Sequence, residues 1–227
     1  MLKKILESFR RPNKSNLVLV PSSEKVAGLW TYTSGDSPKP VLSVLRDVTS
    51  PALMELCDDY WNSHLPEFKA ALPDGVRAVR SYEAYVAAFN ALVARGPEII
   101  HWARERLSHP GYDAREGAAV LLGELARRDL LGDQQDAIAA ELAELAQRPW
   151  NKDTKEVQAN EAAVRALANI GGPICIDTMC QILTSSHWQE DDLQWSATEV
   201  LAQVTEHPFM EAEDPVQAAK DWLDLHA

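Results

Sequence analysis

Between Tyr82 and the C-terminus, hydrophobic residues recur with the spacing of an α-helix. Four segments, starting at residues 85, 118, 163 and 197, each carry one residue at position i and large apolar residues at i+4 and i+7. The triplets are Tyr85/Phe89/Leu92, Ala118/Leu122/Leu125, Ala163/Leu167/Ile170 and Ala197/Leu201/Val204. This spacing places the members of a triplet on one helix face. Because the starts lie 33, 45 and 34 residues apart, the pattern predicts a helical repeat.

A second amphipathic helix is predicted after each of these segments, over residues 97–109, 136–148, 172–185 and 214–227. Several of these stretches begin with Asp or Pro, which are typical of the first turn of a helix. A single helix pair cannot bury its own apolar face, but stacked pairs can. The pattern therefore predicts a mainly α protein in which residues 81–227 form a right-handed α-solenoid of about four helix pairs.

Residues 1–80 differ in composition from the rest of the chain. They predict a small N-terminal segment that mixes short strands with a helix. Residues 17–20 and 29–33 read as short strands, and a helix is expected from Ser50, with Pro51 in its first turn. Residues 1–16 predict a short amphipathic helix that docks on the domain, with a membrane-surface helix as the alternative. No continuous apolar run in the sequence indicates a signal peptide or a membrane span.

The clearest copy of the repeat is NEAAVRALANIGGPICIDTMCQIL, residues 160–183. It resembles the HEAT-repeat superfamily, and within it the short bacterial HEAT-like repeats of the kind found in phycobilin lyases. In that comparison Gly171 and Gly172 end one helix and Pro173 starts the next. Residues 114–133 form a similar copy with a longer connection. The resemblance implies a protein-binding scaffold, because HEAT-like proteins mostly bind other proteins.

Charge is distributed unevenly along the chain. The net charge is −12, with +2 in residues 1–80 and −14 in residues 81–227. A general nucleic-acid binder needs a basic surface, so this balance argues against one and favours a basic protein partner. The three cysteines, Cys57, Cys175 and Cys180, are too few for a disulfide scaffold and indicate reduced thiols in a cytoplasmic protein.

No pattern in the sequence points to catalysis, a cofactor or a metal. The six histidines form no HExxH and no Cys/His cluster with zinc spacing. Phosphate-binding glycine motifs and GxSxG are also missing from the sequence. We therefore expect no enzymatic activity, no cofactor and no bound metal.

Acidic residues and tryptophans gather near the C-terminus, most densely in WQEDDLQW, residues 188–195. One interpretation is a polar cap, in which acids near helix N-termini favour the macrodipole. The other is an acidic recognition edge in which a tryptophan anchors a basic partner. The candidate partner-binding residues are Trp150, Trp188, Glu190, Asp191, Asp192, Trp195, Glu211, Glu213 and Asp214.

Together these features predict a cytoplasmic protein-binding module without catalysis. By analogy with acidic immunity proteins and antitoxins, some of which are HEAT-like, it is expected to inhibit a basic toxin. A scaffold or adaptor role is the alternative within the same class. A HEAT-like DNA glycosylase would need a basic groove, which a charge of −14 opposes. The repeat is the only feature of the sequence that would support a role as a lyase or chaperone for bilin attachment.

Overall fold

The computed structural model describes residues 48–62, 82–149, 156–185 and 192–226. Within these ranges the protein is mainly α-helical and contains no strand. The chain divides into two compact units, Met1–Ala88 and Phe89–Ala227. The predicted strands over 17–20 and 29–33, the predicted helix in residues 1–16 and the predicted boundary after residue 80 all lie outside the described residues.

In the first unit, helix α4 (Ser50–Asn62) begins at the predicted residue. Leu53 and Trp61 are buried. Helix α6 (Tyr82–Arg95) starts in this unit and continues into the second. Tyr85 of α6 stacks on Tyr60 with 4.4 Å between ring centroids and meets Trp61 edge-on at 5.8 Å. Aromatic contacts of this kind favour a fixed arrangement of the two helices within the unit.

The second unit consists of helices joined by short connections. Its elements after α6 are η1 (Gly96–Ile99), α7 (Ile100–Arg106), α8 (Tyr112–Arg127), η2 (Gly132–Gln134), α9 (Gln135–Ala146), α10 (Val157–Ile170), α11 (Gly172–Thr184), α12 (Asp192–Thr205), η4 (Phe209–Glu211) and α13 (Pro215–His226). Every helix predicted from the repeat pattern is confirmed.

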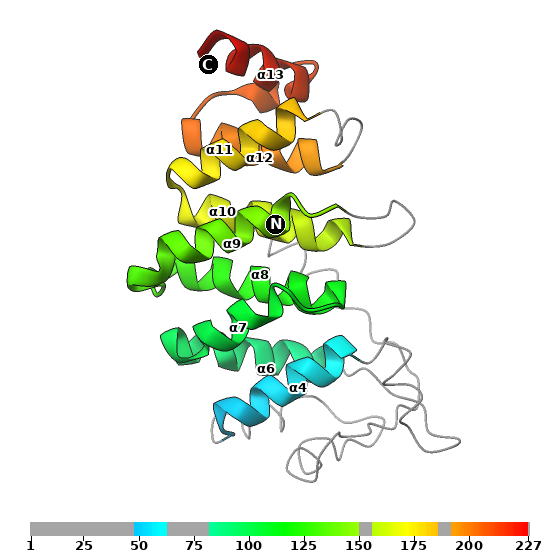
Figure 1. The fold of residues 1–227 in the computed structure, drawn as a ribbon, viewed down its shortest axis with the longest axis vertical. Coiled ribbons are helices and arrows are strands. Elements are labelled where there is room, and N and C mark those ends of the chain that lie inside the picture. Colours follow the sequence, from blue (N-terminus) through cyan, green and yellow to red (C-terminus); the bar gives the residue numbers. More distant parts are fainter. Residues whose placement is uncertain (1–47, 63–81, 150–155, 186–191, 227) are drawn as a thin grey trace, which may run out of the picture. The chain divides into compact units, whose positions relative to one another are not determined.

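These helices are arranged in two layers. Helix α10 packs between α8 and α12 in one layer, and α11 contacts both α9 and α13 in the other, as Figure 1 shows. Contacts of α10 with α9, and of α12 with α11 and α13, join the layers. The apolar triplets face this interior, where Leu122, Leu167 and Leu201 have no exposed surface. Each pair of helices therefore depends on its neighbours for burial.

Helices α8 and α10 approach closely at Gly123. A Cβ atom built on Gly123 would lie 3.0 Å from both Cα and Cβ of Ala166. Ala118 and Ala163, the small first members of their triplets, are fully buried. Small residues at a helix crossing allow the backbones to come together, so the packing of α8 on α10 depends on their size.

The turn between α10 and α11 has the geometry that its glycines predict. Gly171 and Gly172 have φ angles of 70° and 78°, in the region that favours glycine. The amide of Gly171 donates to the carbonyl of Leu167 at 2.8 Å and closes the end of α10. Pro173 lies in the first turn of α11. The predicted helix end and helix start are both confirmed.

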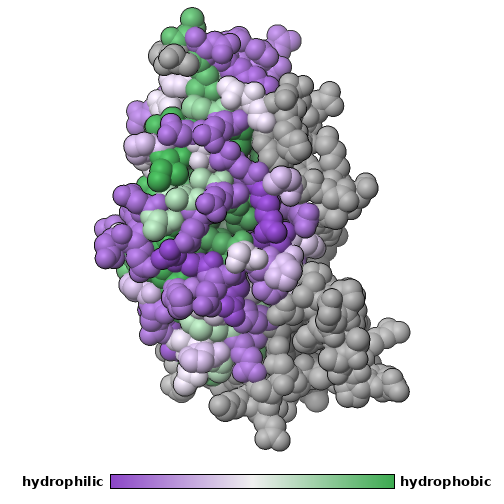
Figure 2. All heavy atoms as spheres, in the orientation of Figure 1, coloured by the Kyte–Doolittle hydropathy of each residue, from purple (hydrophilic) through white to green (hydrophobic). Residues whose placement is uncertain are grey.

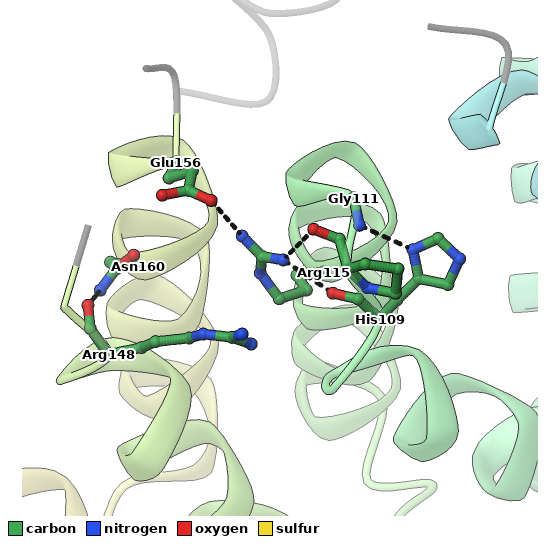
Figure 3. A network of polar contacts seen from close by, with 7 residues as sticks. His109, Gly111, Arg115, Arg148, Glu156 and Asn160 are labelled. Atoms are coloured by element: carbon green, nitrogen blue, oxygen red, sulfur yellow. Dashed lines mark hydrogen bonds and ion pairs between the residues drawn. The ribbon is translucent and has the colours of Figure 1, made fainter. Parts of the chain in front are cut away.

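Three buried polar side chains fasten successive helix pairs together: Arg115, Asn160 and Gln194. Each lies three residues before the first member of its triplet and donates to carbonyl oxygens near the C-terminus of the preceding helix (Figure 3 shows the first two). The acceptors belong to His109 and Pro110 for Arg115, to Ala146 and Arg148 for Asn160, and to Ile182 and Leu183 for Gln194. We call these residues the inter-helix clamps. Asn160 and Gln194 satisfy carbonyls at a helix end, and Arg115 satisfies two carbonyls in the loop that follows α7.

Candidate protein-binding surface

The predicted partner-binding residues fall into three groups. Trp150, Trp188, Glu190 and Asp191 lie outside the described residues. Asp192 and Trp195 lie on the first turn of α12. Glu211, Glu213 and Asp214 follow in the connection between α12 and α13. The two described groups stand at opposite ends of α12, which is about 20 Å long at 1.5 Å per residue, so they do not form one cluster.

One side of α12 presents a tryptophan within a row of acids. Asp192, Trp195 and Glu199 lie within about 60° of arc at 100° per residue, and Glu206 follows the last residue of the helix. Asp192 and Glu206 are exposed, Glu199 is half-buried and Trp195 keeps 46% of its surface exposed. The opposite side of the helix is buried. We call these four residues the α12 acidic face.

Helix α10 contributes a further carboxylate beside this face. An Nη atom of Arg165 donates to Glu161 at 3.2 Å and to the hydroxyl of Ser196 on α12 at 3.4 Å. Burial raises the pKa of Glu161, and the charges of Asp192 and Glu199 raise it further against the opposing effect of Arg165. Asp192 and Glu199 are therefore close enough to Glu161 for their charges to act on it, and Arg165 is the cation with which Glu161 pairs among the described residues.

Helix capping explains some of these acids but not all of them. Asp192 in the first turn of α12 interacts favourably with the macrodipole. Glu206 follows the C-terminus of the same helix, where a negative charge is unfavourable, and its φ of 55° is unusual for a residue other than glycine. Glu199 lies in the middle of the helix. The polar-cap interpretation therefore covers Asp192 and leaves Glu199 and Glu206 without a local structural reason.

The second acidic run has a clearer structural role. An oxygen of Asp214 accepts a hydrogen bond from the backbone amide of Gln217 at 3.0 Å, and Pro215 is the first residue of α13. This is the arrangement of an N-cap. Phe209 is buried in the same connection, stacked on His207 with 4.1 Å between ring centroids. Asp214 thus serves α13, while Glu211 and Glu213 are exposed.

A polar cleft of about 390 Å³ lies between α7 and α9. Arg104 and Glu141 line it and are already paired, because Nε of Arg104 donates to both carboxylate oxygens at 3.1 and 3.0 Å. Leu107 and Leu145 form its apolar part. The face drawn in Figure 2 is largely hydrophilic around α9. Because Arg104 and Glu141 neutralise each other, the cleft offers a partner less unpaired charge than the α12 acidic face does.

The described ranges bring together no group of three His, Cys, Asp or Glu side chains with the arrangement of a metal site. Among the same residues, none of the helices combines the length and hydrophobicity that crossing a membrane requires.

The cysteine thiols are shielded from reaction. Burial raises the pKa of Cys175 to about 11. The pKa of Cys57 is also raised, mainly by burial and to a smaller extent by the negative charge of Asp58. The pKa of the half-buried Cys180 is raised by burial and by Asp177. At pH 8 a thiol with a pKa near 11 is about one thousandth ionised, and the thiolate is the reactive species.

We therefore expect iodoacetamide at pH 8 to label Cys180 first in the native protein. At pH 8, Cys57 and Cys175 should react only after denaturation, because both side chains have no exposed surface. Mass spectrometry of timed digests measures this order. Labelling of Cys175 as fast as Cys180 would contradict the burial described here.

Glu161, Glu199 and Glu206 were not among the sequence-predicted site residues. Asp192, Glu199 and Glu206 are spaced by seven residues each, and this spacing is visible in the sequence. The proximity of Glu161 is not, because it arises from the packing of α10 against α12. Comparisons of this chain with protein-family models, with curated proteins and with solved structures return no significant match.

Proposed function

We propose that this protein is a non-catalytic binding module that recognises a basic protein through the α12 acidic face. In this proposal the helix pairs of the second unit form a right-handed, HEAT-like α-solenoid of about four pairs. The two-layer arrangement of α8 to α13 and the recurrence of the clamps support that architecture. A rigid array of this kind holds a binding surface in place without needing a catalytic centre.

The observation that carries the proposal is the exposure of Trp195 within a row of acids. Among the described residues, Asp192, Glu199 and Glu206 have no ion-pair partner. Exposed tryptophans are frequent anchors of protein interfaces, and unpaired acids attract a basic partner and orient its approach. Phosphates would be repelled by the same charges, which argues against the DNA glycosylase alternative.

The biological role that best fits such a surface is cytoplasmic inhibition of the immunity or antitoxin type. An inhibitor must associate quickly with its target, and charge complementarity increases the rate of association. A scaffold or adaptor would use the same surface without blocking the partner. An activity assay of the bound partner separates these two roles, because an inhibitor abolishes that activity and an adaptor leaves it.

Charge reversal on α12 tests the proposed surface. We expect the double variant Asp192→Lys and Glu199→Lys to bind its basic partner at least about tenfold more weakly at low salt, mainly through slower association. The partner is first co-purified from the native host, and association is then measured by surface plasmon resonance at two salt concentrations. Circular dichroism should show unchanged helix content.

A matched control changes the same charge elsewhere. Asp221 and Asp224 are exposed on α13, so Asp221→Lys and Asp224→Lys alter the net charge equally without touching α12. We expect this control to weaken binding less than about threefold. Equal losses in both double variants would show that net charge, and not the α12 acidic face, attracts the partner. Recovery of no basic partner would refute the proposed function itself.

A further inference from the structure

The cleft between α7 and α9 is lined by an arginine that has no partner. Arg148 lies just after the end of α9 and is exposed. Its side chain makes no hydrogen bond or ion pair with any residue that the structure describes, although Glu144 lies only four positions earlier. Arg104, Arg127 and Arg165, by contrast, each pair with a carboxylate. Arg148 is therefore a cation that a ligand can use.

The backbone of Arg148 is held in place. Its carbonyl accepts a hydrogen bond from the buried Asn160 at 2.8 Å, and its amide donates to the carbonyl of Leu145 at 3.2 Å. From there the side chain extends to the side of Arg115, as Figure 3 shows. Burial lowers the pKa of Arg115, and the charge of Arg148 lowers it further. The two guanidinium groups repel each other, so an anion beside Arg148 would relieve an unfavourable interaction.

Two other polar groups of the cleft are acceptors. The hydroxyl of Ser108 donates to the carbonyl of Glu105 at 3.1 Å, so its oxygen remains free to accept. Glu144 is exposed and has no hydrogen-bond partner within the described ranges. A ligand of this cleft therefore needs an anionic group for Arg148 and an N–H group for these acceptors.

The cleft also has an apolar floor and limited room. Leu107 and Leu145 line it with 7% and 4% of their surface exposed. Its volume of about 390 Å³ lies near the lower end of the range for small-ligand sites. A ligand that fits carries a carboxylate, an N–H group and one apolar side chain. The C-terminal residue of a peptide has all three on a single α-carbon.

We propose that the cleft between α7 and α9 binds the apolar C-terminal residue of a peptide, whose carboxylate pairs with Arg148. A guanidinium and a carboxylate match in shape and form two parallel hydrogen bonds. The amide N–H of the same residue donates to Ser108 or Glu144. Its side chain packs on Leu107 and Leu145. None of these residues belongs to the α12 acidic face, so the site is independent of the proposed function.

Two other anionic ligands fit these groups less well. An Asp or Glu within a peptide uses its side chain for the carboxylate, so it has none left to cover the leucines. A phosphate group carries about 1.5 to 2 negative charges at neutral pH. Glu144 and the net charge of −14 in residues 81–227 would repel the second of these charges. Arg148 can neutralise the single charge of a carboxylate.

Three short peptides test this site. The first ends in leucine with a free carboxylate, and the second is the same peptide with a C-terminal amide. The third is also amidated and has glutamate in place of that leucine. All three are N-acetylated, so that no ammonium group is attracted by the acidic protein. Each is titrated into the isotope-labelled full-length protein at about 50 mM salt, and NMR chemical shifts give the dissociation constants.

We expect the free acid to bind at least about fivefold more tightly than either amidated peptide, because the charge-assisted hydrogen bonds to Arg148 need the terminal carboxylate. The amide signals of Ser108 and Arg148 should shift most. The protein as a whole is negative and repels the free acid, so a preference for this peptide reports a local cation.

Variants then locate the carboxylate. In Arg148→Met the free acid and its amide should bind within about twofold of each other. Glu144→Gln removes a negative charge but keeps an acceptor, so it should strengthen binding of the free acid by about twofold. Arg127→Met, which removes a cation from α8, should keep the preference for the free acid. Thermal unfolding checks that each variant retains the fold.

Three outcomes would overturn the proposed site. The first is equal binding of the free acid and its amide, and the second is equally tight binding of the glutamate peptide. The third is loss of the preference in Arg127→Met as well as in Arg148→Met, which would place the carboxylate elsewhere. The proposed function fails on a different result, the recovery of no basic partner from the host.

Discussion

Replacement of Gly123 by valine is expected to lower the free energy of unfolding by about 3 kcal/mol. A Cβ atom at this position meets the backbone Cα and the Cβ of Ala166 at 3.0 Å, and neither can rotate away. The two γ-methyl groups of valine would push α8 away from α10 and disturb the buried side chains on both sides. Urea or guanidinium unfolding, followed by circular dichroism, measures the loss.

The matched control is Ala137→Val, which adds the same two γ-methyl groups at an exposed position of α9. It should cost less than about 1 kcal/mol, mostly through helix propensity. Gly123→Ala is expected to fall between the two, because alanine gains about 1 kcal/mol of helix propensity but still creates the contact with Ala166. If Gly123→Val and Ala137→Val are equally stable, α8 and α10 do not approach as closely as described.

Replacement of Arg115 by methionine, which keeps part of the apolar stem but removes the guanidinium, is expected to cost about 3 kcal/mol of stability. Arg115 is 97% buried, and its Nη1 donates to the carbonyls of His109 and Pro110 at 2.7 Å each. Its Nη2 lies 3.4 Å from a carboxylate oxygen of Glu156. Methionine would leave two carbonyls and a carboxylate without these partners.

The surroundings of Arg115 explain why its removal is not compensated. Burial lowers the pKa of its guanidinium, and the nearby charge of Arg148 lowers it further against the effect of Glu156. The charge therefore persists in a buried position because the loop carbonyls and Glu156 stabilise it (Figure 3).

Arg127→Met is the matched control for this prediction. Arg127 lies on the same helix and pairs with Glu124 at 2.7 Å, but its side chain is 56% exposed. Exposed ion pairs contribute about 1 kcal/mol or less, so the control should stay close to the wild type. Comparable losses for Arg115→Met and Arg127→Met in denaturant unfolding would show that Arg115 does not clamp the α7–α8 connection.

Sequence reasoning succeeded for the helices and only in part for the candidate surface. The triplet pattern located α8, α10 and α12, and Gly171, Gly172 and Pro173 located the turn before α11. The sequence-predicted binding residues centre on the continuous acidic run at residues 190–192 and do not include Glu199 or Glu206, and the binding role of all of them stays a prediction. The arrangement of the helix pairs as a solenoid stays a prediction.

The inter-helix clamps show how a repeat can be missed in a sequence. Arg115, Asn160 and Gln194 occupy the same position relative to their triplets, but they differ in charge, size and shape. A search for similar residues does not find them. Their shared property is the ability to donate two hydrogen bonds to carbonyls at or just beyond the end of the preceding helix, and this property appears only when that backbone is in place.

The amino-acid order alone therefore determined which stretches of this protein are helical and which side of each helix is apolar, because periodicity and helix-end residues act locally along the chain. Tertiary structure decided which polar groups meet. Glu161 lies beside the α12 acidic face because α10 packs on α12. Asp214 acts as the N-cap of α13. Gly123 is required because the backbones of α8 and α10 cross there. These contacts join residues distant in sequence, so no local pattern specifies them.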